Sequence, residues 1–190
     1  MRIAISGTQS TGKTTLAEDL AGALPNTRVE PEPFRVLKNR LGLVSGADFM
    51  TPEQELALIR HASSRLSAFR AGETIIYDRC ALDALAHAVV AAESGNRAFT
   101  EAWMQQLRSE AMAALSPLDL LVVVPLEEGL ELVDDGVRST DGAYRAAVDR
   151  TIRALADDLS INVLEVRGSR SERVRRILLE IDPHGDYTRG

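Results

Sequence analysis

Nine residues near the amino end, GTQSTGKTT, have the types and the spacing that phosphate binding requires. Gly7 lets the chain turn sharply, and Gly12 lets backbone N–H groups approach phosphate oxygens without a Cβ in the way. Lys13 would place its ammonium group on the β- and γ-phosphates, and Thr14 would be a ligand of Mg²⁺. The residues expected around the nucleotide are Gly7, Thr8, Gln9, Ser10, Thr11, Gly12, Lys13, Thr14 and Thr15.

The neighbours of this stretch agree with a phosphate-binding loop. RIAIS, residues 2–6, favours a β-strand, and in KTTLAEDLAGAL leucines recur every four residues, which indicates a helix. The amino end of that helix would add unpaired N–H groups and a positive dipole to the site. A Gly-rich turn that merely begins a helix is the alternative, and the order strand, loop, helix makes it far weaker. We therefore expect ATP or GTP, with Mg²⁺, to bind here.

Further strands and helices alternate along the chain. Strands are expected at 27–30, 74–80, 118–126 and 161–166, and helices at 51–72, 81–94, 98–116, 146–159 and 171–181. The segment from about 35 to 50 is expected to be irregular. Alternation of this kind predicts an α/β fold, a three-layer sandwich around a parallel five-stranded sheet. We expect one domain over residues 1–181 and a loose tail over 182–190.

Composition excludes several other classes of protein. The formal charge is −6, from 22 basic and 28 acidic residues, so nucleic acid is not an expected partner. The single cysteine, Cys80, cannot form an internal disulfide and lacks the companions of a zinc site. No apolar run approaches the ~18 residues of a membrane helix. We expect a cytoplasmic protein without membrane contact, and its state as a monomer or a homodimer is left open.

A second polar group follows the strand TIIYDRC. Asp78 stands where a triphosphate site needs an acid for magnesium, at the end of a strand beside the first one. Arg79 adds a fixed charge suited to a phosphate or a substrate. An ordinary ion pair at the rim of the sheet is the alternative reading of this pair.

Taken in order, GTQSTGKTTL, EPF, IIYDRCALDALAH and DDGVRS resemble the P-loop small-molecule kinases. The chain is most similar to the AAA-type, nicotinamide riboside kinase-like ATPases, with deoxynucleoside and thymidylate kinases as wider relatives. The resemblance covers residues 1 to about 181, and it implies a P-loop nucleotide kinase-like fold. Only the phosphate loop is specific by itself.

The resemblance also implies roles for residues outside the loop. Asp78 would lie by magnesium, Arg79 would meet substrate or phosphate, and a lid around 127–145 would close an arginine on the γ-phosphate. DDGVRS offers Arg138 for that role, with Arg145 and Arg150 as alternatives. A polar surface loop remains the competing interpretation of this segment.

The resemblance suggests further contacts at the two ends of the site. A glutamate after the second strand would take the proton of the substrate; Glu32 is preferred, Glu30 stays open, and a solvated acidic turn is equally compatible. Arg35 could contact the same substrate. Near the adenine, the resemblance places a loop containing Gly168, with Arg170 or Arg173 stacking on the base. The regulatory-GTPase element NKxD is absent from the sequence, which favours ATP.

These patterns lead to two functional hypotheses. The first is an ATP- and Mg²⁺-dependent phosphotransferase acting on a small-molecule acceptor, most simply a nucleoside, a nucleotide or a related metabolite, bound in a cleft covered by residues 34–65. The alternative is a regulatory P-loop ATPase that couples ATP hydrolysis to a partner protein. Packing or solvent roles are expected for His61, His87, His184 and Cys80. Trp103 and Met104 are expected either in the core or in the wall of the substrate cavity.

Overall fold

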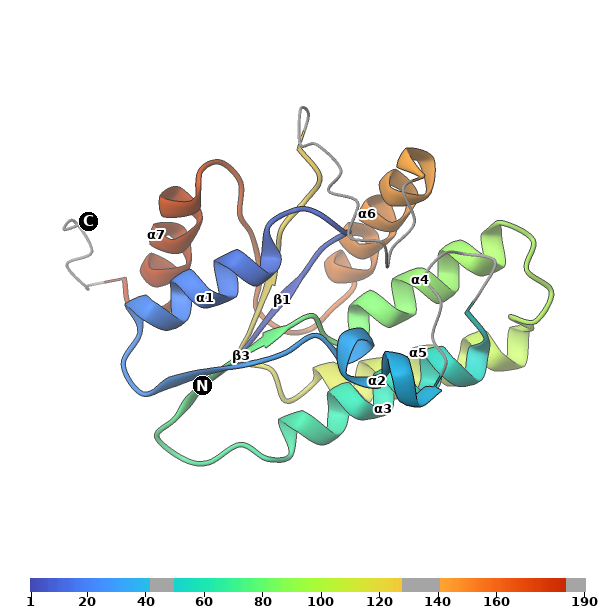
Figure 1. Ribbon diagram of the computed structural model, residues 1–190, viewed down its shortest axis with the longest axis horizontal. Coiled ribbons are helices and arrows are strands. Elements are labelled where there is room, and N and C mark those ends of the chain that lie inside the picture. The colour runs from blue at the N-terminus through green and yellow to red at the C-terminus, as the bar shows by residue number, and fades with distance from the viewer. Residues whose placement is uncertain (42–49, 128–140, 184–190) are drawn as a thin grey trace.

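A parallel five-stranded sheet forms the centre of the protein (Figure 1). The computed structural model describes residues 1–41, 50–127 and 141–183. The strands run in the spatial order β2-β3-β1-β4-β5. Their bounds are β1 Arg2–Ser6, β2 Thr27–Glu30, β3 Thr74–Asp78, β4 Leu120–Val123 and β5 Val163–Glu165. The predicted α/β sandwich with five parallel strands is confirmed.

The strand order places the ends of β1 and β3 side by side. β1 lies between β3 and β4, and the register pairs Ile5 with Asp78 and Ser6 with Val123. After β1, the chain forms β2 and β3 on one side of that strand and then crosses to the other side, where it forms β4 and β5. In parallel α/β sheets, ligands bind in the crevice that such a reversal opens at the carboxyl ends of the strands. The loop after Ser6 and the residues after Asp78 meet in this crevice.

Helices cover both faces of the sheet (Figure 1). On one face, α1 and α7 pack on a core that includes Ile3, Ile5 and Val122. On the other face, α3, α4, α5 and α6 pack on a core that includes Ala4, Tyr77 and Leu121. Alternate strand residues therefore serve opposite faces, as the period of two requires. The helices are α1 Lys13–Ala23, α2 Pro33–Leu41, α3 Pro52–Leu66, α4 Ala81–Glu93, α5 Glu101–Leu115, α6 Gly142–Asp157 and α7 Arg170–Ile181.

The expectation of an irregular chain after residue 35 is wrong, because α2 forms there. The helix begins at Pro33, whose fixed φ suits the first helical position, and the N–H of Val36 donates to the carbonyl oxygen of Glu32 at 3.3 Å. Leu37 is buried in the core below α3. Prolines that alternate with Glu30 and Glu32 predict an end to regular structure, but the second of them, Pro33, is the first residue of a helix.

Two smaller points concern the ends of elements and the membrane. α3 ends at Leu66, six residues before the glycine expected to end it, and turns then lead to β3. None of the helices in the described ranges combines the length and hydropathy that spanning a bilayer requires. The extent of the predicted domain, 1–181, and the looseness of the tail remain predictions.

Candidate active site

The phosphate loop lies between β1 and α1 and depends on two glycine conformations. Gly7 has a φ of 150°, and a Cβ placed there would lie 2.3 Å from the carbonyl oxygen of Val124, so no other residue fits. Gly12 precedes α1 with a left-handed φ of 84°, and no side chain caps the helix. The first N–H groups of α1 are therefore open to an anion, which is the arrangement expected of a phosphate site.

Lys13 lies inside this loop. Its side chain is buried; Nζ donates to the carbonyl oxygen of Thr8 and lies 3.4 Å from Oγ1 of Thr11. Burial lowers the pKa of Lys13 well below its usual value, and the positive charge of Arg79 lowers it further. A bound phosphate would reverse both effects by supplying negative charge beside Nζ. The loop therefore holds the amino group of Lys13 in place but does not supply enough negative charge to offset its burial.

Thr14 and Asp78 meet at the end of the sheet, as the sequence predicted. Oγ1 of Thr14 donates to Oδ2 of Asp78 at 2.6 Å, with Thr14 exposed and Asp78 buried. Two oxygen ligands next to a phosphate loop suit Mg²⁺, which keeps several waters and takes its other ligands from phosphates. The described residues hold no cluster of three or more His, Cys, Asp or Glu side chains that could bind a metal by themselves. Magnesium fits here as a partner of the nucleotide.

Arg79 is joined to three parts of the site. Nε contacts Oε1 of Glu32 at 2.7 Å, and NH1 donates to Oδ1 of Asp83 at 2.9 Å and to the carbonyl oxygen of Gly7 at 3.2 Å. Burial by itself would lower the pKa of Arg79, but the charges of Glu32, Asp83 and Asp78 raise it overall. The guanidinium is therefore permanently charged and held in the crevice.

The backbone of Arg79 is strained. Its φ of 66° lies in the left-handed region, which costs a long side chain about 1–3 kcal/mol. Arg65 of α3 helps to hold this turn, because NH2 donates to the carbonyl oxygen of Arg79 at 3.1 Å and NH1 to that of Pro31 at 2.6 Å. Sequence reasoning missed Arg65, and since these contacts join residues far apart in the chain, no local signal could have shown them.

Asp83 is a second residue that sequence reasoning missed. Its carboxylate accepts from the N–H of Cys80 at 3.0 Å, which caps α4, and lies 3.4 Å from the N–H of Gly7. It thus ties the start of α4 to the phosphate loop and pairs with Arg79. An acid three residues after a helix cap is a recognisable capping pattern, so this residue could have been found.

The two candidate bases have different environments. Glu32 is buried at the start of α2, where it contacts Arg79 and, through Oε2 at 3.2 Å, Nε of Arg35. Glu30 ends β2, and its carboxylate pairs with Arg28. Glu32 lines the pocket described next, whereas Glu30 does not. The geometry favours Glu32 over Glu30.

A pocket of about 640 Å³, counting the space open to solvent, adjoins the phosphate loop. Its polar wall includes Gln9, Glu32, Arg79 and Asp83. Its apolar wall is formed by Pro33, Phe34, Met50, Leu58 and Ala84. These residues come from the loop, α2, α3 and α4, so the expected cleft over residues 34–65 is present but needs the other elements too. An apolar pocket with a few convergent polar groups is the usual form of a small-molecule site.

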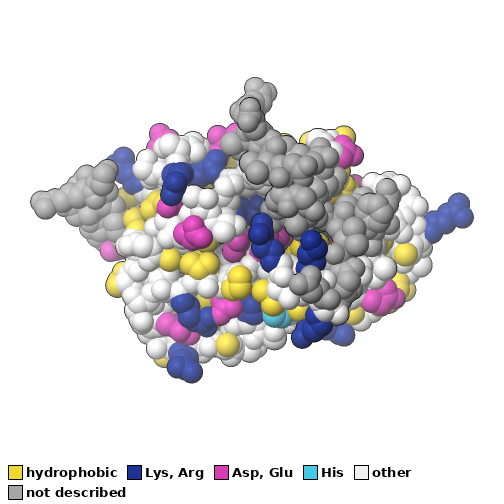
Figure 2. Space-filling view, in the orientation of Figure 1, with side chains coloured by type: hydrophobic (Ala, Val, Ile, Leu, Met, Phe, Trp, Pro, Cys, Tyr) yellow, Lys and Arg dark blue, Asp and Glu magenta, His cyan; other side chains and the backbone are white. Residues whose placement is uncertain are grey.

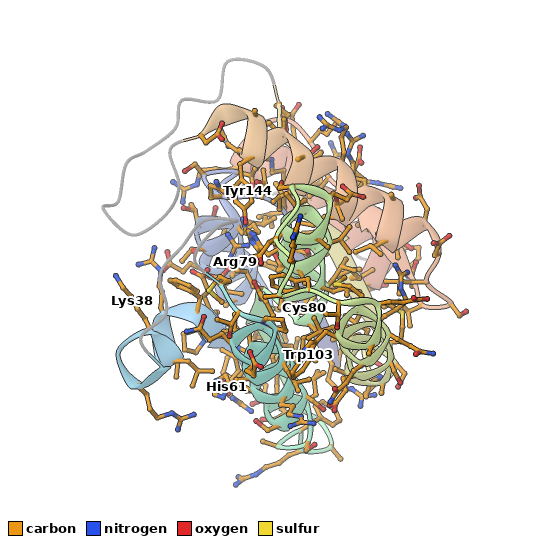
Figure 3. All side chains as sticks on the ribbon, turned by 90° about the vertical axis from the view of Figure 1, so that its right-hand side faces the viewer. Lys38, His61, Arg79, Cys80, Trp103 and Tyr144 are labelled. Carbon is orange, nitrogen blue, oxygen red and sulfur yellow. The ribbon has the colours of Figure 1, made fainter. Side chains whose placement is uncertain are left out.

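His87 and Tyr144 complete this pocket. Nδ1 of His87 lies 2.6 Å from the hydroxyl oxygen of Tyr144, and both residues line the pocket. In the view of Figure 3, Tyr144 of α6 and Arg79 lie near each other, whereas the side chain of Lys38 on α2 points outward from the protein. Burial lowers the pKa of His87 to about 4, and the charge of Arg79 contributes. His87 is neutral at pH 7.

Of the three candidate lid arginines, the structure describes two. Arg138 lies outside the described residues, as do residues 128–140 of the predicted lid, and its role stays a prediction. Arg145 is buried, and it donates from Nε to the carbonyl oxygen of Gln9 at 2.9 Å and from NH2 to that of Ser10 at 3.2 Å. Arg150 is exposed on α6. The geometry therefore favours Arg145 over Arg150.

The expected adenine side is formed by α7. Arg170 is exposed there and pairs with Asp19 of α1 at 2.6 Å. Arg173 is buried and donates from NH1 to the carbonyl oxygen of Thr11 at 2.7 Å. Gly168 has a φ of 86°, and its N–H donates to Glu127 at 3.2 Å. Of the two arginines of α7, Arg173 contacts the phosphate loop and Arg170 pairs with α1. The roles of Gly168, Arg170 and Arg173 beside adenine stay predictions.

Of the remaining residues singled out from the sequence, the structure describes Trp103, Met104, Cys80 and His61. Trp103 and Met104 pack against the larger core and are not among the pocket residues. Cys80 is buried in the pocket lining, and burial raises the pKa of its thiol, which disfavours the reactive thiolate. His61 on α3 is partly exposed, and His184 lies outside the described residues.

The family of the chain is settled by a match to one family model. The model, described as an AAA domain, matches residues 2–173 and thus the phosphate loop, the strand ending at Asp78 and the start of α7. The chain belongs to this AAA-domain family. No curated protein matches its sequence significantly.

Solved structures similar to this AAA-domain protein include a thymidylate kinase, a deoxyadenosine kinase and NadR. Thymidylate kinase from Candida albicans has a TM-score of 0.69 at 18% identity, over 96% of this chain and 92% of that one. Deoxyadenosine kinase from M. mycoides has a TM-score of 0.66 at 14% identity, over 96% and 100%. NadR in complex with NR has a TM-score of 0.73 at 18% identity, over 97% of this chain and 52% of that one. At these identities the likeness establishes the P-loop nucleotide-kinase fold, and the predicted resemblance is confirmed.

The surface of the AAA-domain protein has mixed charge on the face shown in Figure 2. Acidic, basic and apolar side chains are interspersed there among the described residues. Nucleic-acid-binding faces carry clustered basic residues. The described side chains of this face form no such cluster, and the absence of a nucleic-acid partner stays a prediction.

Proposed function

We propose that this protein is an ATP- and Mg²⁺-dependent kinase that transfers the γ-phosphoryl group to a small acceptor, a nucleoside, a nucleotide or a related metabolite. The observation that carries the proposal is the position of Glu32, a buried carboxylate bonded to Arg79 in a pocket that also includes Gln9 of the phosphate loop. A carboxylate beside the donor phosphate is what a hydroxyl acceptor needs. The fold shared with thymidylate and deoxyadenosine kinases supports the same class of acceptor.

Each group of the site then has a task. The N–H groups of the loop and the ammonium of Lys13 bind the β- and γ-phosphates, while Thr14 and Asp78 hold magnesium, which when bound neutralises phosphate charge. Glu32 accepts the proton of the acceptor hydroxyl. The acceptor oxygen bonds to the γ-phosphorus, the bond from that phosphorus to the bridging oxygen breaks, and ADP leaves with the electron pair.

Two arginines from different elements would orient the reactants. Arg79 binds Glu32 and would also meet the acceptor or the transferred phosphoryl group, as its fixed charge allows. Arg145 holds the carbonyl groups of Gln9 and Ser10, which keeps the loop N–H groups turned toward the phosphates. A regulatory ATPase has no small-molecule acceptor and would therefore have no use for this pocket.

The test measures ADP release from ATP and Mg²⁺ in the presence of a panel of nucleosides, nucleotides and sugars. We expect strong stimulation by one class of acceptor and a mass increase of that compound by one phosphoryl group. Lys13→Ala should lower turnover by at least about 100- to 1,000-fold, because the transition state loses a cation. Arg60→Ala, which removes a surface ion pair with Glu110, is the control and should keep wild-type turnover.

The alternative function has a clear result in the same experiment. Steady ADP release that is indifferent to every acceptor would contradict the kinase and support a regulatory ATPase. Absence of calorimetric binding of ATP with Mg²⁺ would contradict both functions.

A further inference from the structure

Glu55, in the first turn of α3, is a buried carboxyl group to which no described residue donates a hydrogen bond. Its side chain is only 2% exposed. Among the described residues, four buried side-chain nitrogen or oxygen atoms have no partner, and Oε2 of Glu55 is the only carboxyl oxygen among them. Burying such a group unpaired destabilises a fold, so a native protein that keeps one calls for an explanation.

A role at the start of the helix does not explain Glu55. Carboxylates in a first turn interact favourably with the helix dipole, but Glu53 lies on the exposed side of the same turn and could do this without burial. Thr51 and Gln54 already form the capping box of α3. The interior position of Glu55 is therefore unnecessary for the helix.

The location of Glu55 points to a ligand. It lines the same pocket as Glu32 and Asp83, but each of those carboxylates pairs with Arg79, whereas Glu55 has no described partner. Besides Glu55, the same pocket is lined by the apolar side chains Phe34, Met50, Leu58 and Ala84. These side chains suit a flat ring and offer no hydrogen bond to the carboxyl group. The missing partner would come from whatever fills the pocket.

Burial also determines which form of the carboxyl group is present. It raises the pKa of Glu55 well above the usual value of a glutamate, which favours the neutral acid. A neutral carboxylic acid has an O–H donor next to a carbonyl acceptor. The matching partner is a group with a carbonyl oxygen next to an N–H, as in a lactam or a carboxamide. A phosphate would leave the carboxyl oxygen unpaired.

We propose that Glu55 recognises the acceptor, by pairing its carboxyl edge with the lactam or carboxamide edge of a planar ring held between the apolar walls. The inference rests on the proposed kinase function and specifies its acceptor class: a nucleoside-like compound whose ring carries neighbouring N–H and C=O groups. Glu32 acts on the hydroxyl of this compound, and Glu55 selects its ring.

The experiment compares wild type with Glu55→Gln and Glu55→Leu. The probes are uridine and inosine, which have a lactam edge, nicotinamide riboside, which has a carboxamide, and ribose, which has neither. We expect at least one ring-bearing probe to be phosphorylated by wild type, with kcat/KM well above that for ribose. For that probe, kcat/KM of Glu55→Gln should stay within about 5-fold of the wild-type value, because an amide keeps one donor and one acceptor. The kcat/KM of Glu55→Leu should fall by about 10- to 100-fold.

Controls separate recognition of the acceptor from damage to the site. Binding of ADP with Mg²⁺ should be equal in wild type and both variants, and Glu53→Leu, in the same turn but exposed, should keep wild-type kcat/KM. In the absence of acceptor, Glu55→Leu should melt at or above the wild-type temperature, because an unpaired buried group is removed. A merely structural Glu55 would instead give a lower melting temperature in both variants.

Several results would overturn the inference and leave the kinase standing. One is phosphorylation of ribose as efficiently as of every ring-bearing probe; another is unchanged kcat/KM in Glu55→Leu. Equal losses in both variants would indicate a carboxylate that binds a cation and not a neutral edge. If wild type phosphorylates none of the probes, the inference also fails, and the wider acceptor panel then decides whether the kinase function fails with it.

Discussion

The phosphate loop and the acceptor pocket adjoin each other, but their buried polar groups are satisfied in different ways. In the loop, Lys13 donates to a carbonyl oxygen, and arginines from α6 and α7 hold the carbonyl groups of Gln9 and Thr11. In the pocket, Oε2 of Glu55 has no partner among the described residues. The loop is thus held by bonds between described residues, although Nε of Arg173 beside it also lacks a partner among them. For the pocket, we have proposed that the missing partner of Glu55 comes from the acceptor.

This difference has a functional meaning. A donor site that is preorganised spends little free energy on ordering when the nucleotide binds, and it can serve any reaction of the triphosphate. An unsatisfied carboxyl group penalises every acceptor that lacks the matching edge, and this is how sites built around hydrogen bonds reject analogues. Binding of the phosphoryl donor would therefore reside in the loop, whereas the pocket would supply both the base, Glu32, and the selection of the acceptor.

Glu32→Gln gives the largest expected effect that separates the two regions. The amide cannot take the proton of the acceptor, so kcat for phosphoryl transfer should fall by about 100- to 10,000-fold. The loop does not use this side chain, so calorimetry should give nearly the wild-type Kd for ATP with Mg²⁺.

Glu30→Gln is the matched control for this prediction, because Glu30 ends β2 and its carboxylate pairs with Arg28 outside the pocket. The kcat of Glu30→Gln should stay within about 3-fold of the wild-type value. A loss of ATP binding in Glu32→Gln would mean that the two regions are coupled through Arg79. Unchanged kcat would remove Glu32 as the base.

The two regions also differ in how far the sequence predicts them. The loop is a continuous run from Gly7 to Thr15 whose function depends on local backbone geometry, so the pattern alone predicted it and its place beside Asp78. The pocket joins residues of α2, α3, α4 and α6 that are far apart in the chain. Glu55 has no local pattern to distinguish it from Glu53, because only the packing of α3 decides which of the two is buried.

The fold itself was predictable to a similar degree. Strands buried on both faces, such as β4, appear as apolar runs, and leucine spacing marks α1. α2 was missed because its Pro33 has two meanings, a breaker after a strand or the first residue of a helix, and only packing of Leu37 against the core decides between them. The partners of Arg65 and Arg145 are likewise set by tertiary contacts.

Arg145→Ala should have an intermediate effect and tests whether the order of the loop matters to the pocket. Without its guanidinium the carbonyl groups of Gln9 and Ser10 lose two donors, and we expect kcat to fall by about 10-fold with a smaller change in the Kd for ATP. Arg150→Ala, on the exposed side of the same helix, should have little effect. If Arg150→Ala proved the more damaging variant, the lid role would move away from Arg145.

His87→Phe gives the smallest expected effect, a change in how the stability of the protein depends on pH. Burial lowers the pKa of His87 to about 4, below the value of about 6.5 in an unfolded chain. Between these values the unfolded state binds more protons, so the free energy of unfolding should fall as the pH drops from about 6.5 toward 4. The ring is partly exposed, which limits the loss to about 1–2 kcal/mol.

The charged and titratable groups that influence or contact His87 are Arg79, Asp83, Glu32, Lys13 and Tyr144. The variant leaves all of them in place, so urea unfolding of both proteins at pH 7.5, 6 and 5 isolates the imidazole. Glu55, whose pKa is raised, acts in the opposite direction, because its contribution to stability falls as the pH rises. The difference in the free energy of unfolding between wild type and His87→Phe should shrink toward low pH. A constant difference would contradict the lowered pKa, because it would mean that the imidazole takes up its proton equally well in the folded and the unfolded protein.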